Sequence, residues 1–588
     1  MPKTANYTIT RRAVDIAQSK FSDAVSPLLQ RVLLGRGVVD DSGVSHHLQQ
    51  LQRPESLAGL DEAMQLLIEA LQQQQPVLII GDFDADGATS SALMVLALRA
   101  MGMQSVDFLV PNRFEFGYGL TPEIVTVAVE RFQPKLIITV DNGIASIDGV
   151  ASAKSQNIKV IITDHHLPGE TLPAADAIVN PNQLTCNFPS KNLAGVGVSF
   201  YLLSVLSSRL QTEGWFQQQK IAAPNMADYL DLVALGTVAD VVPLDQNNRV
   251  LVFQGIQRIR SGFARPGILA LLEIAGRQAN TLRASDLGFI VGPRLNAAGR
   301  LDDMSLGIQC LLTDDWEQAQ ALAAELDQLN RERRHIESAM QAEALEYLEM
   351  LSEHNNDNNL PWGLCLYDSG WHQGVVGILA SRMKDRHHRP VIAFANADDN
   401  NVDGLIKGSA RSIPGLHIRD VLDGIATRHP QLLQKFGGHA MAAGLSIAKK
   451  NYPLFAKVFD EAVKSCLTEC NLRAEIISDG SLHPSELNLT NAREINDRIP
   501  WGQSFPEPLF DGTFYLLQQR IVGQKHLKMV LSMDTENRYL VDAIAFSVDT
   551  DQWPDQQVSK VFIVYRLGIN EYRGNESVQL IVNMIDKC

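Results

Sequence analysis

Short, uninterrupted apolar runs alternate with segments of helical period over the first 180 residues. Such runs are typical of parallel strands that are covered on both faces. They predict strands at 77–80, 106–110, 136–140, 159–163 and 177–180. The segments between them predict helices at 60–75, 88–101, 124–132 and 147–155. Strands that alternate with helices at this spacing indicate an α/β fold with a doubly wound, mostly parallel sheet.

The pattern changes twice after this sheet. Residues 313–354 are charged and helix-prone, which predicts one long connector helix to a smaller α/β unit at 355–468. Five β-rich runs then predict a small antiparallel barrel within 469–588. These runs lie at 514–522, 528–533, 539–548, 561–567 and 578–585. With a helical lead-in at 1–55 and the first α/β domain at 56–312, the chain divides into five parts.

The composition is that of a globular protein. Hydrophobic residues make up 45% and charged residues 20% of the 588, which excludes wholesale disorder. The formal net charge of −16 excludes a nonspecific basic coat for polyanions but not a local basic groove. Some of the 67 acidic residues are candidates for metal ligands.

Cysteine usage and hydropathy indicate a reducing compartment. The six cysteines are sparse and include no CxxC pair, so we expect neither a structural zinc site nor a disulfide framework. No stretch of 18 apolar residues occurs, and no apolar run follows the start MPKTANYTITRR. We therefore expect a cytoplasmic protein without a membrane segment.

Acidic and histidine residues follow three of the predicted strands. The first strand runs into GDFDADG, in which Asp82, Asp84 and Asp86 alternate; two others end in Asp141-Asn142-Gly143 and Asp164-His165-His166. Alternate residues of an extended segment share a face, and the carboxyl ends of parallel strands meet at one crevice. A further acid, Asp240, closes an apolar helical segment. Each motif alone is typical of a turn or cap, but their coincidence predicts a metal site.

The ligand chemistry predicts the kind of metal. Carboxylates with one imidazole suit Mg²⁺ or Mn²⁺ better than zinc. The number of carboxylates suits two ions about 4 Å apart, the arrangement used for phosphoester hydrolysis.

The three strand-end motifs, DxD, DNG and DHH, resemble the motif series of the DHH phosphoesterase superfamily. Within it, the chain is similar to the RecJ family of single-stranded-DNA-specific exonucleases from about residue 50 to 588. The segments that carry this resemblance are PNRFEFGYG (111–119), NPNQ (180–183), LAGVG (193–197), GTVADVVPL (236–244), VGPRLNAAGRLDD (291–303), GSARS (408–412) and FGGHAMAAG (436–444). The resemblance implies a DHH domain at 56–312, a DHH-associated domain at 355–468 and an oligonucleotide-binding (OB) barrel at 469–588.

The resemblance also implies a ligand set for two divalent cations, Mn²⁺ or Mg²⁺. Asp84 and Asp240 would hold one ion, Asp86 and His165 would hold the other, and Asp141 would bridge the two.

Three further residues complete the implied catalytic group. His166 would contact the scissile phosphate, and Asp164 would orient a histidine. Asp82 is either a ligand or a support for Asp84. In many superfamily members a histidine stands two residues before Asp82, and here Ile80 stands there, which leaves one ion with fewer protein ligands.

Contacts to DNA are predicted on both α/β units. Arg113, Ser409 and Arg411 match the family's phosphate-pocket positions, and arginine suits phosphate oxygens. The other candidates are Arg294 and Arg300 for the backbone, Tyr118 or Phe116 for base stacking, and His439 for a phosphate. The alternatives are a solvated surface charge for each arginine, a core role for Phe116 and a structural role for His439.

The resemblance implies a metal-dependent exonuclease that degrades single-stranded DNA 5′→3′ to 5′-mononucleotides in recombination and repair. A small-substrate DHH phosphoesterase acting on short oligonucleotides is a second hypothesis, and a non-catalytic DNA-binding scaffold is a third. The presence of Asp84, Asp86, Asp141, His165 and Asp240 favours an enzyme over the scaffold. A single-strand-binding protein and a helicase are the partners that the resemblance implies, and we expect a monomer.

Overall fold

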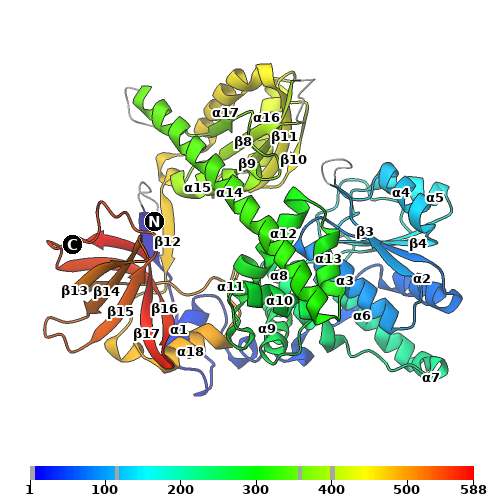
Figure 1. Ribbon diagram of the computed structural model, residues 1–588, viewed down its shortest axis with the longest axis horizontal. Helices are drawn as coiled ribbons and strands as arrows, with labels where there is room; N and C mark the ends of the chain where they lie inside the picture. Colours follow the sequence, from blue (N-terminus) through cyan, green and yellow to red (C-terminus); the bar gives the residue numbers. More distant parts are fainter. Residues whose placement is uncertain (1–6, 113–117, 355–359, 398–403) are drawn as a thin grey trace. The chain divides into compact units, whose positions relative to one another are not determined.

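The structure, a computed structural model, describes residues 7–112, 118–354, 360–397 and 404–588. It separates into two compact units, which are described one at a time (Figure 1). The first unit contains residues 15–330 and 493–507, and the second contains residues up to 14, 331–492 and 508–588.

The first unit is built on a five-stranded sheet in the order β3-β2-β4-β5-β6. All of its pairs are parallel, which confirms the predicted doubly wound sheet. The strands are β2 (Val77–Ile80), β3 (Val106–Leu109), β4 (Leu136–Val140), β5 (Lys159–Thr163) and β6 (Ala177–Val179).

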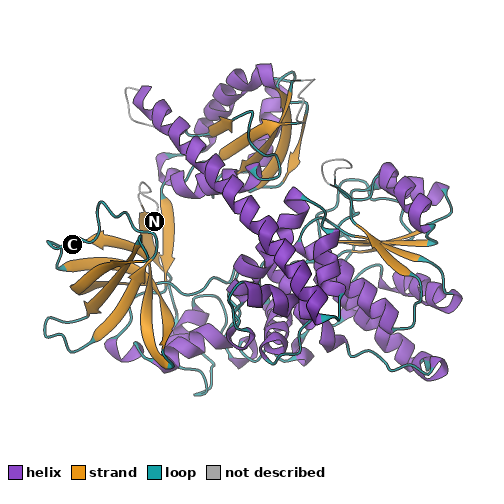
Figure 2. Ribbon diagram, viewed as in Figure 1, coloured by secondary structure: helices purple, strands orange, loops and turns teal. Residues whose placement is uncertain are grey.

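Helices cover both faces of this sheet, as Figure 2 shows. Ile79 and Ile138 face a core formed with α2 (Leu60–Gln73), α3 (Ala85–Ala100) and α6 (Gly195–Thr212). Their neighbours Leu78 and Ile137 face the opposite way, toward α4 (Pro122–Phe132) and α5 (Ile147–Ser155). Because neither face meets water, the strands are apolar at every position rather than at alternate ones.

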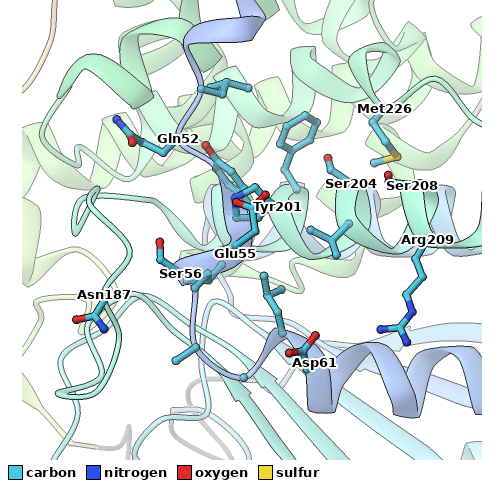
Figure 3. Close-up of a pocket in the computed structure, with 18 of the residues that line it drawn as sticks. Gln52, Glu55, Ser56, Asp61, Asn187, Tyr201, Ser204, Ser208, Arg209 and Met226 are labelled. Carbon is cyan, nitrogen blue, oxygen red and sulfur yellow. The ribbon is translucent and has the colours of Figure 1, made fainter. Parts of the chain in front are cut away.

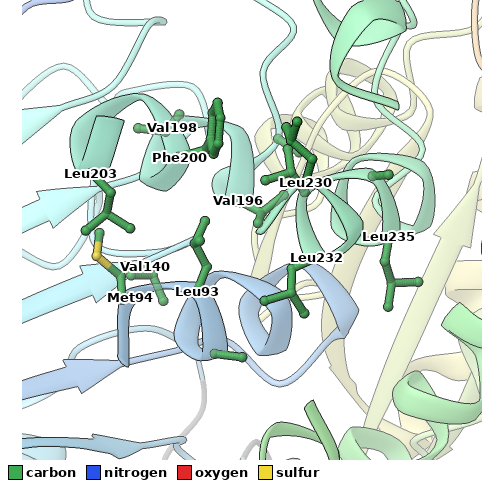
Figure 4. Close-up of a cluster of buried hydrophobic side chains, with 14 of the residues drawn as sticks. Leu93, Met94, Val140, Val196, Val198, Phe200, Leu203, Leu230, Leu232 and Leu235 are labelled. Atoms are coloured by element: carbon green, nitrogen blue, oxygen red, sulfur yellow. The ribbon is translucent and has the colours of Figure 1, made fainter. Parts of the chain in front are cut away.

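A helical layer extends the first core away from the sheet. It consists of α1 (Pro27–Leu34), α7 (Trp215–Gln219), α8 (Leu230–Ala239), α9 (Gln246–Arg260), α10 (Pro266–Ile274), α11 (Ala284–Asp286), α12 (Gly292–Leu301) and α13 (Ser305–Leu312). Helix α6 borders a cavity on one side (Figure 3) and the buried cluster of α3 and α8 on the other (Figure 4). Helix α3 is buried almost all round because it lies between the sheet and these helices.

Residues 493–507 return to this unit from late in the sequence. Ile499 and Phe505 are each 4% exposed within its core. The Arg249 guanidinium lies 4.2 Å from the centre of the Phe505 ring, and the Leu244 N–H donates to the Gln503 carbonyl at 2.8 Å. Residues beyond position 469 therefore contribute to the core of the first unit.

Helix α14 (Trp316–His354) is the predicted connector. It begins three residues after the expected position 313, because the Asp315 carboxylate accepts the Gln318 N–H at 2.7 Å and caps the helix there. The predicted linker at 355–359 lies outside the described residues.

The second unit contains a mixed sheet in the order β10-β11-β9-β8-β7. Only the pair β7–β8 is parallel. The strands are β7 (Leu364–Tyr367), β8 (Val391–Asn396), β9 (Leu405–Arg411), β10 (Lys435–Gly438) and β11 (Ala442–Ala448). The helices packed with them are α15 (Val376–His387), α16 (Ile418–Arg428) and α17 (Tyr452–Cys466).

The C-terminal strands of the second unit form a closed five-stranded barrel, as predicted. The order is β13-β14-β15-β17-β16, and β15 pairs with β17 in parallel, so the barrel is not wholly antiparallel. The strands are β13 (Phe510–Val522), β14 (His526–Ser532), β15 (Leu540–Ala545), β16 (Lys560–Tyr572) and β17 (Asn575–Lys587). Helix α18 (Leu489–Arg498) precedes the barrel in sequence.

The N-terminal segment differs from the predicted helical lead-in. From residue 7 on, where its description starts, it has one α-helix, α1, and its first element is β1 (Tyr7–Arg11), which pairs in parallel with β12 (Ala474–Ser478). A strand whose partner lies more than 450 residues away has no local signal of pairing. Among the described residues, no helix is both long and apolar enough to cross a membrane.

Candidate metal centre

The DFDADG segment is a helix start rather than an extended strand. Asp84 is the N-cap of α3, and its Oδ1 accepts the N–H groups of Asp86 at 2.9 Å and Gly87 at 3.1 Å. The helix therefore begins at Ala85, not at the predicted residue 88. A Cβ on Gly87 would lie 2.6 Å from the Asp82 backbone, so the loop folds closely over this glycine.

Asp86 lies in the first turn of α3, and its buried carboxylate reaches the start of a second helix, α6. Its carboxylate accepts the N–H groups of Gly195 at 2.6 Å and Val196 at 2.9 Å, at the N-terminus of α6. Burial, followed by the charge of Asp84, nevertheless raises the pKa of Asp86 to about 7. The first glycine of the LAGVG segment, Gly195, is required here, because a Cβ at this position would lie 2.6 Å from the Cβ of Asp141.

Helix α12 also contacts the loop that carries Asp82, Asp84 and Asp86. Asn296 Oδ1 accepts the Ala85 N–H at 2.7 Å. A Cβ on Gly299 would lie 1.8 Å from the Phe83 carbonyl oxygen, so only glycine allows this approach. The NAAGR segment thus positions the acidic loop, a role that its sequence did not suggest.

Replacing Asn296 tests this positioning role. Asn296→Leu is expected to lower metal affinity by about 10- to 100-fold, because the Ala85 N–H loses its acceptor. Asn296→Asp keeps an acceptor oxygen and is expected to retain more of this affinity. The measurement is a calorimetric titration with Mn²⁺, with a melting curve for each variant. An unchanged Mn²⁺ titration with a lower melting temperature would show that Asn296 only stabilises the fold.

Asp141 follows β4 in a strained conformation. It is 1% exposed and has φ 61°, which is unusual for a residue other than glycine. The next side chain fixes this turn, because Asn142 Nδ2 donates to the carbonyls of Ile80 at 3.0 Å and Val140 at 2.9 Å. Burial and the surrounding acids raise the pKa of Asp141 well above its usual value.

The DHH segment after β5 contains an ion pair and a neutral imidazole. His166 Nδ1 lies 2.7 Å from Asp164 Oδ1, which also accepts the His165 N–H at 2.7 Å. Burial disfavours the charged imidazole, but the bond to Asp164 outweighs it and raises the pKa of His166 to about 9. The pKa of Asp164 falls despite its burial, for the same reason. Burial and the charge of His166 lower the pKa of His165 to about 4, so its ring is neutral at pH 7.

Asp240 reaches the same place from the C-terminus of α8. It caps this helix, and its Oδ2 lies 3.5 Å from His165 Nε2, which is also 3.1 Å from Asp141 Oδ1. Burial and the charges of Asp86 and Asp84 raise the pKa of Asp240 well above its usual value.

These side chains form three overlapping groups with ligand atoms within 4.8 Å of one another. The groups are Asp86, His165 and Asp240; Asp82, Asp84 and Asp141; and Asp141, His165 and His166. Asp141 Oδ1 and His165 Nε2 are buried and have no hydrogen-bond partner among the described residues. Buried acids that repel one another, beside a neutral imidazole nitrogen without a proton donor, fit divalent cations.

The other candidates in this unit lie around the group. Tyr118 OH donates to the Asp141 carbonyl at 3.3 Å and lies 3.4 Å from the ring nitrogens of His166. Arg300 is half-buried in the last turn of α12. Arg113 and Phe116 lie outside the described residues.

Arg294 differs from the expected solvent-facing arginine. It is 7% exposed, and its guanidinium Nη2 lies 2.9 Å from the Asp327 carboxylate. A contact with DNA would require this pair to open, so the geometry favours a structural role that joins α12 to α14.

Ser409, Arg411 and His439 belong to the second unit. Arg411 Nη1 donates to Ser409 Oγ at 2.9 Å and to the Ala410 carbonyl at 2.8 Å. Burial lowers the pKa of Arg411, and it takes part in none of the ion pairs found in the described part of the chain. His439 is exposed at the turn between β10 and β11.

Sequence reasoning missed the residues that orient the others. Asn142, Asn296 and the asparagines of the NPNQ segment hold backbone groups, since Asn180 Nδ2 donates to the His166 carbonyl at 2.9 Å and Asn182 Nδ2 donates to that of His165 at 2.6 Å. Their position inside the quoted motifs was the available signal.

The fold and this acidic centre define a protein of the DHH class. Residues 76–237 match the DHH family, N-terminal domain, and residues 362–465 match the DHHA1 domain. Residues 478–584 match the RecJ OB domain.

Similar proteins of known name identify the family within the DHH class to which this chain belongs. The chain is 54% identical to the single-stranded-DNA-specific exonuclease RecJ of Escherichia coli (strain K12), over 98% of each chain. It is 50% identical to the protein of the same name from Haemophilus influenzae, over 98% of this chain and 99% of that one. The chain therefore belongs to the RecJ family of single-stranded-DNA-specific exonucleases.

Solved structures agree with this assignment. The crystal structure of RecJ in complex with Mn²⁺ from Thermus thermophilus is 29% identical, with a TM-score of 0.80 over 99% of this chain and 80% of that chain. The Mg²⁺ complex from the same organism gives 28% and 0.74, over 99% of this chain and 78% of that chain.

Proposed function

We infer that this chain is a metal-dependent exonuclease that hydrolyses single-stranded DNA from the 5′ end and releases 5′-mononucleotides. The observation that carries this conclusion is the convergence of five carboxylates and His165 at the carboxyl edge of one parallel sheet. The high identity to RecJ exonucleases over the whole chain supports the substrate.

We propose a ligand set that differs in part from the one implied by the resemblance. Asp86, His165 and Asp240 would hold one divalent cation, Mn²⁺ or Mg²⁺, Asp82 and Asp84 would hold a second, and Asp141 would contribute to both sites. Asp240 thus moves to the group of His165, and Asp82 becomes a ligand. Divalent cations held by these residues would supply Lewis acidity for activating a water and for neutralising charge on the phosphoryl group.

The remaining side chains orient and polarise the substrate. His166 carries a proton at neutral pH, and its bond to Asp164 through Nδ1 leaves Nε2 to donate to a phosphoryl oxygen. Tyr118 fixes the turn beneath it through the Asp141 carbonyl. The strained turn at Asp141 holds its carboxylate in place before substrate arrives.

Metal binding is expected to strengthen as pH rises. Protons compete with metal for Asp86, whose pKa is about 7, and for Asp141 and Asp240, so Mn²⁺ affinity should rise about tenfold or more between pH 6 and 8. Without metal, the folding stability changes with pH in the opposite direction. Because the pKa of Asp86 is raised in the folded chain, its contribution to stability is fully present below about pH 4 and is lost as pH rises through about 7. Calorimetric titration with Mn²⁺ and melting curves in EDTA measure both. Equal Mn²⁺ affinity at the two pH values would contradict the proposed ligands.

Polarity requires a group that holds the 5′ end. We propose that Arg411 and Ser409 bind the 5′-phosphate, because the Arg411 guanidinium is largely desolvated and has no carboxylate partner among the described residues. Arg411→Ala should reduce the preference for 5′-phosphorylated over 5′-hydroxyl ends by about tenfold. Initial rates on the two substrates measure this, with the exposed Arg419→Ala as control. An equal loss on both ends would instead indicate a general backbone contact.

The test of the function is a time course on single-stranded DNA labelled at the 5′ or the 3′ end, with Mn²⁺ or Mg²⁺ and an EDTA control. Immediate release of mononucleotide from the 5′ label only is expected. Cleavage restricted to very short oligonucleotides would favour the small-substrate phosphoesterase. Tight binding without cleavage would favour the scaffold.

Domain limits, oligomeric state, localisation and partners are part of the same proposal. We propose that the catalytic domain is 56–312 together with 493–507, the DHH-associated domain is 355–468, and the OB barrel grips the strand as a second contact. We further propose a cytoplasmic monomer that works with a single-strand-binding protein and a helicase.

A further inference from the structure

A cavity of about 1050 Å³ lies in the first unit, outside the metal centre (Figure 3). It is enclosed by the segment 48–62, by the outer side of α6 and by residues 225–230. None of the residues of the three metal-ligand groups lines it. Its size is that of a ligand-binding pocket rather than a packing defect.

The floor of the cavity is apolar. Leu57, Leu60, Phe200, Tyr201, Met226 and Leu230 line it. Ser204 also lines it. Leu57, Leu60, Phe200, Tyr201 and Leu230 are each 7% exposed or less, so each presents only one edge to the cavity. Apolar side chains of another molecule would cover these edges favourably.

The walls of the cavity are fixed before any ligand binds. The Gln52 N–H donates to Asn247 Oδ1 at 2.9 Å, and the Ala58 N–H donates to Cys186 Sγ at 3.4 Å. Gly59, with φ 82°, lies so close to β6 that a Cβ would be 2.0 Å from the Ile178 carbonyl oxygen. A preformed wall of this kind reduces the ordering entropy that binding would otherwise cost.

The rim of the cavity is negative. Glu55, Asp61 and Glu62 line it, are exposed, and take part in none of the ion pairs found among the described residues. The helix dipole accounts for Asp61 and Glu62, which lie in the first turn of α2, but not for Glu55. The rim cation, Arg209, is already paired with Glu213 at 3.2 Å. The rim therefore presents uncompensated negative charge around an apolar floor.

We propose that this cavity is a docking site for a segment of a partner protein in which apolar side chains alternate with lysine or arginine. The apolar side chains fill the floor, and the basic ones lie over Glu55, Asp61 and Glu62. The site is separate from the chemistry. Helix α6 binds Asp86 at residues 195 and 196, whereas the cavity begins at Phe200 and continues along the helix to Arg209, roughly 7 to 20 Å further on.

The test uses the full chain saturated with Mn²⁺, so that the metal centre does not attract a basic probe. Fluorescein-labelled peptides of sequence KLFKL and ELFEL are titrated and followed by anisotropy. Three variants are compared: Ser208→Trp, which fills the cavity from an exposed lining position; Asp61→Asn with Glu62→Gln; and Gln211→Trp, which places the same bulk on α6 outside the cavity.

The expected result is binding of KLFKL with a Kd on the order of 100 µM or below. Ser208→Trp should weaken it at least about tenfold, the double charge variant about threefold to tenfold at low salt, and Gln211→Trp not at all. Exonuclease activity should be unchanged in all three variants. Equal binding of ELFEL, an unchanged Kd in Ser208→Trp, displacement of the peptide by single-stranded DNA, or no binding of either peptide would overturn the proposal.

Discussion

Asp141→Asn is expected to lower the rate of DNA hydrolysis by about 10³-fold or more. Asp141 is shared by two of the three ligand groups, and it faces His165 Nε2 at 3.1 Å. The amide has nearly the same size but cannot supply a charged bridging oxygen. The Mn²⁺-dependent rise in melting temperature should fall with the activity, while the fold persists.

In the absence of metal, the same variant is expected not to lose thermal stability. In EDTA, Asp141→Asn should melt at the same or a higher temperature than the parent chain, because it removes a buried carboxylate whose pKa is raised by burial and by its acidic neighbours. Asp176→Asn is the matched control, since this acid pairs with Lys154 and Lys159 away from the metal centre. Retention of more than about a tenth of the activity in Asp141→Asn would exclude the shared-ligand assignment.

A chain ending at residue 470 is expected to lose catalysis, whereas a chain ending at 507 should retain it. The shorter chain lacks Ile499 and Phe505, which are buried in the catalytic unit. Loss of one buried phenylalanine costs about 3–5 kcal/mol, so the melting temperature should fall by roughly 10 °C or more. It also loses the hydrogen bond that the N–H of Leu244, four residues after Asp240, donates to the Gln503 carbonyl.

The longer chain isolates the role of the barrel. The chain ending at 507 lacks β13–β17 and should hydrolyse short oligonucleotides but bind single-stranded DNA at least about tenfold more weakly. Melting curves, oligonucleotide cleavage and DNA anisotropy compare the two truncations, with full-length Phe505→Ala as a control for the core. If the two truncated chains melt alike, residues 493–507 do not stabilise the catalytic unit. Unchanged DNA affinity in the longer chain would exclude the barrel as a grip.

Much of the centre was predictable from local pattern. Apolar runs without alternation identify strands buried on both faces, and parallel strands place their carboxyl ends at one edge. Asp86, Asp141 and His165 were therefore assigned to one site from strand ends alone, and the structure places them together. The barrel was predictable for a related reason, because β-rich runs recur along its sequence and burial alternates along strands such as β14 and β15.

Local pattern did not predict which of these side chains lie together in one group. An alternating DxDxD was read as extended, whereas the cap at Asp84 starts α3 at Ala85 and turns Asp86 into the interior. The partner of Asp86 is then the N-terminus of α6, over a hundred residues away. Asp240 joins His165 only because α8 packs against α3, which no local period encodes.

Period, capping and motif spacing between near neighbours were sufficient for most of the elements, for the acidic strand ends and for the family, but not for β1 or for the start of α3. Tertiary structure decided that Asn296 holds the acidic loop, that Arg294 pairs with Asp327, and that residues 493–507 complete the catalytic unit. It also decided that α6 and the segment 48–62 enclose a cavity. These features depend on contacts between residues far apart in the chain, and such contacts are selected by the packing of the whole core rather than by any local preference.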